Sequence, residues 1–131
     1  MEKNISINTD SSKFYRQYLE LLNPLIKLRG KELDVLAQLL FHNNKLKDIP
    51  EPHRWKIIFD YDTKVEIRTA LELSDASMNN NLTSLRKKGI IKNNKVIKNL
   101  LIYPNKKSRI IFNFNIADES GSKKDISENS K

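Results

Sequence analysis

One stretch, Leu73 to Ile91, constrains the fold of this chain more than any other. Apolar side chains recur in it at the i, i+4, i+7 spacing of one helix face, at Met78, Leu82 and Leu85. Ser74 is a good N-cap because its hydroxyl accepts a hydrogen bond from an unpaired amide of the first turn, and Gly89 can take the left-handed conformation that ends a helix. The sequence therefore predicts a helix over residues 75–88 with one buried face.

The opposite face of this helix is polar but hardly ionic until its C-terminal end. It carries amides and hydroxyls and then cations, at Ser77, Asn79, Asn80, Thr83, Arg86, Lys87 and Lys88. A face that meets only water usually holds mixed charges in i,i+4 pairs, whereas amides and hydroxyls can bond base edges. Residues 63–71 indicate a shorter helix, with a capping box at Thr63 and Glu66, and residues 72–74 link the two. The pair indicates a helix-turn-helix.

This stretch resembles the winged helix-turn-helix family, in the version found in small bacterial and phage regulators. The resemblance is carried by Leu73-Ser74, Met78, Leu82, Leu85 and the run Arg86-Lys87-Lys88-Gly89-Ile90-Ile91 that leads into a strand. It covers residues 28–116 and implies an α+β fold, with a core of three to four helices and a C-terminal β-hairpin wing. It also implies that the positions facing bases or nearby phosphates are Ala76, Ser77, Asn79, Asn80 and Thr83.

The predicted wing follows Gly89. Asn93-Asn94 suggest a turn, residues 96–103 a strand, residues 104–108 a second turn, and residues 109–116 alternate between apolar and polar positions. We expect phosphate contacts from the wing cations together with those at the helix end, namely Lys106, Lys107 and Arg109 with Arg86, Lys87 and Lys88. This requires the wing cations and the polar helix face to lie on one side of the molecule.

The net charge of +8 is concentrated in the same part of the chain. Residues 1–75 hold twelve basic and twelve acidic side chains, residues 76–117 hold nine basic and no acidic ones, and residues 118–131 hold three basic and four acidic ones. This distribution is typical of a surface that binds nucleic-acid phosphates. Because Lys, Asn and Ile are frequent throughout, part of the Asn79-Asn80-Asn81 run can reflect an AT-rich coding sequence.

Three parts of the chain are expected. Residues 1–27 form an N-terminal segment and a helix that begins at Asp10 or Ser11 and ends or kinks at Pro24. The aromatic face of this helix is either core or a surface for a protein partner or a second copy. Residues 28–117 form the winged helix-turn-helix domain, which includes a helix over 31–41 and an apolar cluster at 55–59 that is either a short strand or a turn of helix. Residues 118–131 form a polar tail that we expect to be disordered.

Catalysis is not indicated. The chain has no cysteine, which excludes disulfides and thiolate metal sites, and its two histidines, His42 and His53, stand alone and are expected in loops or at the surface. Asp60 and Asp62 are interpreted as a helix start, where carboxylates favour the N-terminal dipole. We therefore expect no enzyme activity, no cofactor and no metal. The sequence shows neither a signal peptide nor an apolar run that spans a bilayer, so we expect a cytoplasmic protein, in a bacterial cell or a phage-infected host, with no membrane partner.

The sequence as a whole predicts a sequence-specific double-stranded DNA-binding protein, a small transcriptional regulator of bacterial or phage type. The helix over 75–88 would enter the major groove, and residues 104–109 would contact the backbone or the minor groove. The alternative is a winged-helix module that serves as a phage structural or protein-interaction adaptor. A homodimer stays open, because two copies would supply the two half-site contacts that tight specific binding needs.

Overall fold

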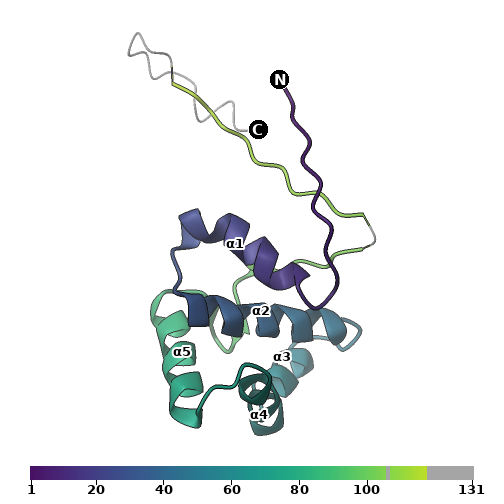
Figure 1. The fold of residues 1–131 in the computed structure, drawn as a ribbon. Coiled ribbons are helices and arrows are strands. Elements are labelled where there is room, and N and C mark those ends of the chain that lie inside the picture. The colour runs from purple at the N-terminus through teal and green to yellow at the C-terminus, as the bar shows by residue number, and fades with distance from the viewer. Residues whose placement is uncertain (106, 118–131) are drawn as a thin grey trace.

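The computed structural model describes residues 1–105 and 107–117, so Lys106 and the tail predicted to be disordered lie outside it. The described chain forms five α-helices, two short strands and one turn of 3-10 helix (Figure 1). The helices are α1 (Phe14–Ile26), α2 (Gly30–Lys45), α3 (His53–Ile58), α4 (Tyr61–Ala70) and α5 (Asp75–Lys87). The strands are β1 (Ile91–Lys92) and β2 (Lys95–Val96), and the 3-10 turn η1 covers Lys98–Leu100. The fold is α+β, with a helical core and a small hairpin.

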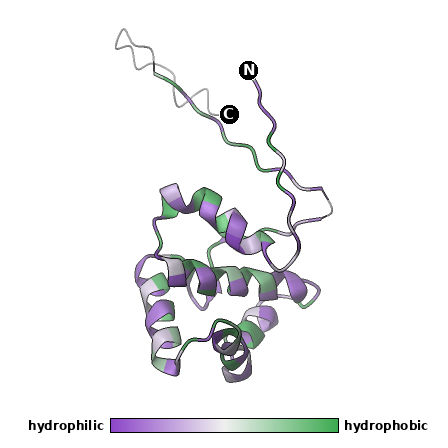
Figure 2. Ribbon diagram, in the orientation of Figure 1, coloured by the Kyte–Doolittle hydropathy of each residue, from purple (hydrophilic) through white to green (hydrophobic). Residues whose placement is uncertain are grey.

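Helix α2 lies at the centre of the core. It packs against α1 on one side and against α3, α4 and α5 on the other (Figure 1). Every helix contributes apolar side chains with almost no exposure, at Leu19, Leu36, Leu39, Leu40, Ile58, Ile67, Met78, Leu82 and Leu85. In Figure 2 polar and apolar residues alternate around these helices, as expected when each helix buries one stripe and leaves the rest in water. None of the helices in the described ranges has the length and apolarity to cross a bilayer.

Helix α1 starts and ends differently from the sequence-based expectation. Asp10 closes a turn before it by accepting hydrogen bonds from the backbone N–H groups of Ser12 and Lys13, at 2.9 and 3.0 Å. The helix includes Pro24 and continues to Ile26. A proline this close to the end removes few helical bonds. The aromatic rings of α1 form part of the core, since Tyr15 and Tyr18 are buried.

Two expectations in the middle of the chain are wrong. The cap of α4 is Asp60, whose Oδ1 accepts from the Thr63 N–H at 2.9 Å, so Thr63 lies inside the helix rather than at its start. His42 is buried on α2 and not at the surface, because it occupies a core-facing position of a helix that runs four residues longer than predicted. Burial lowers the pKa of its imidazole, although the charge of Glu66 opposes this.

The predicted wing is the largest difference. The hairpin found is β1–β2, with Ile91 paired to Val96, and the described residues beyond Val96 form no strand. Asn93 and Asn94 both have positive φ, at 55° and 56°, as a two-residue type I′ turn requires. That turn closes the hairpin within six residues. The chain then runs through η1 to place Leu100 in the core, where its carbonyl accepts from the Tyr18 hydroxyl at 3.2 Å.

Candidate nucleic-acid interface

The link between α4 and α5 is short, as expected. Glu72 takes positive φ, 57°, and the chain then enters α5 at Ser74, whose Oγ accepts from the Ser77 N–H at 3.0 Å. At the other end Gly89 has φ 79°, which a residue with a side chain rarely adopts, and the chain turns there into β1. The predicted cap and stop of this helix are therefore confirmed. Its last helical residue is Lys87 and not Lys88.

The two faces of α5 separate as predicted. Met78, Leu82 and Leu85 are buried against the other helices. Six of the candidate DNA-contacting residues are exposed along the opposite face, at Ala76, Asn79, Asn80, Thr83, Arg86 and Lys87. Thirteen helical residues at a rise of 1.5 Å give this face a length of about 20 Å. A major groove about 12 Å wide admits such a helix.

The three consecutive asparagines have different environments. Asn79 and Asn80 are exposed, whereas Asn81 is buried and its Nδ2 donates to the backbone oxygen of Ser77 at 2.8 Å. Ser77 is half-buried, so of the candidate residues on α5 it is the one tied most closely to the helix itself. Of the three, only Asn79 and Asn80 are exposed to a ligand.

A shallow hollow lies between the start of α5 and the start of α2. It is lined by residues of both helix beginnings, Arg29, Gly30, Lys31, Ser74, Ala76, Ser77, Asn80 and Asn81. Lys31 is exposed, and the side chain of Arg29 is 71% exposed although it pairs with Glu32. The structure therefore places two cations, the N-cap residue Arg29 of α2 and Lys31 in its first turn, beside the N-terminal half of the polar face of α5. The helix pattern of α5 could not have revealed them, because they come from a segment more than forty residues earlier.

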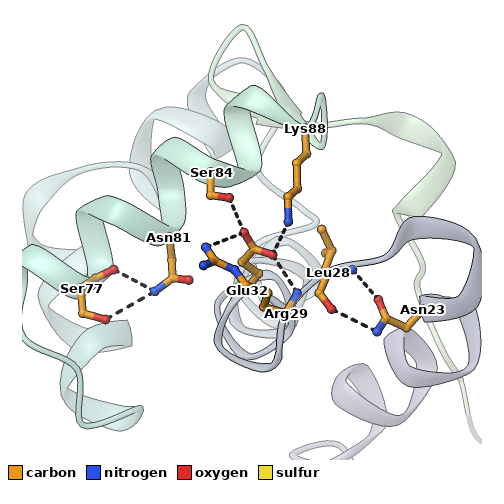
Figure 3. A network of polar contacts seen from close by, with 8 residues as sticks. All are labelled: Asn23, Leu28, Arg29, Glu32, Ser77, Asn81, Ser84 and Lys88. Atoms are coloured by element: carbon orange, nitrogen blue, oxygen red, sulfur yellow. Dashed lines mark hydrogen bonds and ion pairs between the residues drawn. The ribbon is translucent and has the colours of Figure 1, made fainter.

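A buried carboxylate fixes α5 against α2. Glu32 has no exposed side-chain surface, and it accepts hydrogen bonds from the backbone N–H of Arg29 at 2.8 Å, from Lys88 Nζ at 2.8 Å and from the Ser84 hydroxyl (Figure 3). The Arg29 guanidinium adds a further contact at 3.1 Å. A buried charge is tolerated when its oxygens are satisfied in this way. The network holds the C-terminal half of α5 at the first turn of α2.

The same network sets the ionisation of Glu32. Burial would raise the pKa of its carboxyl, but the hydrogen bonds from Arg29, Lys88 and Ser84 outweigh it and lower the pKa to about 2. Lys88 is therefore paired with a carboxylate of the same chain, although 38% of its side chain is exposed. Arg86 and Lys87, the two neighbours of Lys88 that were predicted to bind phosphate, remain exposed.

Two groups of cations follow α5, one that the sequence analysis did not single out and one that it did. Lys92 and Lys95 flank the hairpin turn, are exposed, and belong to a hairpin that packs against α5. The chain that leads to Lys107 and Arg109 is held instead at the far end of α2, where the Tyr103 hydroxyl accepts from Asn43 at 3.1 Å. Lys88 and Glu32 mark the opposite end of α2.

The cations at the hairpin and those near Arg109 thus do not lie together. The prediction that Lys107 and Arg109 form a wing tip beside the polar helix face is wrong, because the turn at Asn93-Asn94 closes the hairpin before the chain reaches them. The sequence signal for the real hairpin was the Asn-Asn pair itself, flanked by lysines. Lys106 lies outside the described residues.

Comparison of the chain with protein-family models, with curated proteins and with solved structures finds no match. Within the described part of the chain, no three His, Asp or Glu side chains are grouped so as to hold a metal ion. The functional assignment therefore rests on the geometry of α5 and its surroundings.

Proposed function

We propose that this protein binds double-stranded DNA, with the exposed polar face of α5 in the major groove, as a small winged helix-turn-helix regulator would. The observation that supports the proposal best is the separation of α5 into a buried apolar stripe and an exposed face that presents Asn79, Asn80 and Thr83. Asparagine can bond N6 and N7 of adenine, and the methyl groups of Ala76 and Thr83 suit the methyl of thymine. The expected site therefore contains A·T pairs.

The surrounding charge supports the same proposal. Residues 76–98 contain no acidic residue, and Arg86, Lys87, Lys92 and Lys95 are exposed among them. Lys31 adds a cation at the other end of α5, beside the hollow. These side chains would contact phosphates on either side of the groove and fix the register of the helix without reading sequence. The hairpin β1–β2 takes the role of the wing in this arrangement.

The first test is a titration of the chain with a random-sequence duplex at several salt concentrations. With about five phosphate contacts, log K should fall against log salt with a slope of roughly −4 to −5, which is a loss of several hundred-fold between 50 and 200 mM salt. An affinity that does not change with salt would contradict the proposal. It would leave the protein-interaction alternative as the better explanation of the exposed face.

The second test asks whether the face reads bases. After selection of a preferred site from the random pool, Asn80→Ala should weaken binding to that site by about 1–3 kcal/mol and leave binding to random DNA nearly unchanged. Asn99→Ala is the matched control, since Asn99 is an exposed asparagine of η1 outside α5. Equal losses for the two variants would show that Asn80 has no role in recognition.

A further inference from the structure

The last described segment of the chain, residues 109–117, has the composition of a strand but does not form one. Every residue in it is exposed, including Ile111 at 72%, Phe114 at 85% and Ile116 at 88%. Within the described residues it pairs with no other strand. Figure 1 shows it extending away from the helices after the turn at Asn105 and Ser108, on the side opposite α5.

Such a segment is an open edge on both sides. Isoleucine and phenylalanine favour strands, and an exposed apolar strand with unpaired N–H and C=O groups is a template for pairing with another chain. In an extended backbone alternate side chains share a face, so Ile110, Phe112, Phe114 and Ile116 form one apolar row. A strand that pairs with this row should carry apolar side chains at the matching positions.

We propose that the segment pairs with the same segment of a second copy, antiparallel, about a two-fold axis through Asn113. In this register Phe112 lies opposite Phe114 of the second copy and Ile110 opposite Ile116, so every residue of the apolar row has an apolar neighbour across the pair. The neighbouring registers that preserve the faces place Ile116 opposite Ser108, or Ile110 opposite the residue after Ala117.

Charge is also compatible with this pairing. Arg109 lies opposite Ala117, so no like charges face each other across the axis. The interface is isologous, the commonest arrangement in protein dimers, and it needs no surface other than the one left uncovered. Because the segment extends away from α5, the pairing leaves the polar face of α5 free in both copies (Figure 1). The proposal does not depend on DNA binding.

The N-terminal segment of the same chain is a poorer partner. It also extends from the helices and is exposed, but it offers only two aliphatic side chains for the four of the apolar row, Ile5 at 85% and Ile7 at 55% exposure. Pairing with it would leave half of the apolar row without an apolar neighbour across the pair. Self-pairing gives every residue of the row such a neighbour, and we therefore favour the second copy.

The experiment measures the mass of the full chain by light scattering as concentration and salt are varied. We expect a monomer–dimer equilibrium that shifts toward dimer as salt rises, because screening weakens the repulsion between two copies of charge +8. Salt weakens duplex binding but should strengthen dimerisation, so a failure of one proposal can be distinguished from a failure of the other. A chain that stays monomeric at the highest soluble concentration in high salt overturns the inference.

The register is tested by a matched pair of double variants. Phe112→Asp with Phe114→Asp places like charges opposite each other twice, and we expect loss of the dimer. Phe112→Asp with Phe114→Lys places opposite charges there, and we expect the dimer to be restored at low salt. Both variants change only exposed side chains, so helical content and thermal midpoint should match those of the unchanged protein. Equal masses for the two variants overturn the register.

Cross-linking gives an independent measurement, because the chain has no cysteine. Asn113→Cys places two thiols at the axis, within the Cα separation that a disulfide needs, whereas Asn115→Cys places each thiol opposite Ile111. We expect the first variant to form at least tenfold more covalent dimer on mild oxidation. Equal yields overturn the inference. Pairing within one chain gives a different result. If the protein is a monomer whose amides at 109–117 are protected from exchange, and the double variant Ile5→Asp with Ile7→Asp removes this protection, the segment pairs with its own N-terminal segment and the inference is overturned.

Discussion

Two stretches of this chain have similar residue patterns but differ in the burial of their apolar side chains. Residues 75–96 and residues 109–117 both mix apolar residues at regular spacing with polar ones and cations. In the first, the apolar stripe is buried and both ends are fixed by a cap and a turn. In the second, the apolar row is exposed. The difference teaches that periodicity identifies a face, whereas burial requires a surface elsewhere in the chain to receive it.

The sharpest test of that contrast is to remove one apolar side chain from each stretch. Leu82→Ala should lower the free energy of unfolding by about 2–5 kcal/mol, because Leu82 is 1% exposed and its loss leaves a cavity in the core. Phe114→Ala, at 85% exposure, should change it by less than about 0.5 kcal/mol. Urea unfolding at high dilution measures both without a contribution from self-association. Similar losses would mean that Phe114 is covered in the monomer.

The next largest effect concerns the carboxylate that joins α5 to α2. Glu32 has a pKa of about 2 in the folded protein against a usual 4.5. Between these values the unfolded chain binds a proton that the folded chain does not, so stability should fall as the pH drops below about 4.5. The contribution, worth about 3 kcal/mol, should be lost by pH 2.

Denaturant melts between pH 6 and 2 measure this loss. Glu32→Gln should weaken the dependence of stability on pH. Asp34 is a half-exposed acid two residues further along α2, and Asp34→Asn should leave that dependence unchanged. A Glu32→Gln protein with the unchanged pH slope would contradict the assignment of the acid sensitivity to this network.

The cap of α5 should have a smaller effect. Ser74→Ala removes the acceptor for the Ser77 N–H and should lower stability by about 1 kcal/mol. Ser11→Ala, an exposed serine outside any helix, is the control and should have no measurable effect. Thermal melts of the two variants give the comparison. If Ser74→Ala also leaves stability unchanged, packing alone fixes the start of α5.

The smallest expected effect separates the two groups of cations. Lys92→Ala with Lys95→Ala should weaken duplex binding a few-fold and reduce the steepness of the salt dependence by about 2, because each phosphate contact contributes about 0.9. Lys107→Ala with Arg109→Ala should leave the slope unchanged. The reverse result would restore residues 104–109 as the DNA-contacting wing and would contradict the role given to β1–β2.

Most of α5 was predictable from the sequence because its signals are local. Ser74, Gly89 and the spacing of Met78, Leu82 and Leu85 each specify geometry within a few residues. The Asn93-Asn94 turn was also identifiable, but its consequence was misjudged. A turn that uses two left-handed residues joins strands directly, and it therefore defined a hairpin that ends at Val96.

The buried hydrogen-bond network around Glu32 could not be predicted from the sequence in the same way. Glu32 is more than fifty residues from Ser84 and Lys88 along the chain. Nothing in the local sequence pattern around these residues distinguishes a buried carboxylate from a surface one. The same holds for His42 and for Asn81, which lie on helices whose neighbours decide their exposure.

The sequence by itself determined where α5 begins and ends, which of its sides is apolar, and that acidic residues are missing from the stretch that follows Asp75. These properties depend on backbone preferences and side-chain chemistry that act over one or two turns. Only the tertiary structure decided which cations share a surface with α5, that Lys88 pairs with Glu32, and that the apolar row of residues 109–117 is exposed. Those outcomes depend on contacts between distant segments, because a side chain is buried or free according to what the rest of the fold places against it.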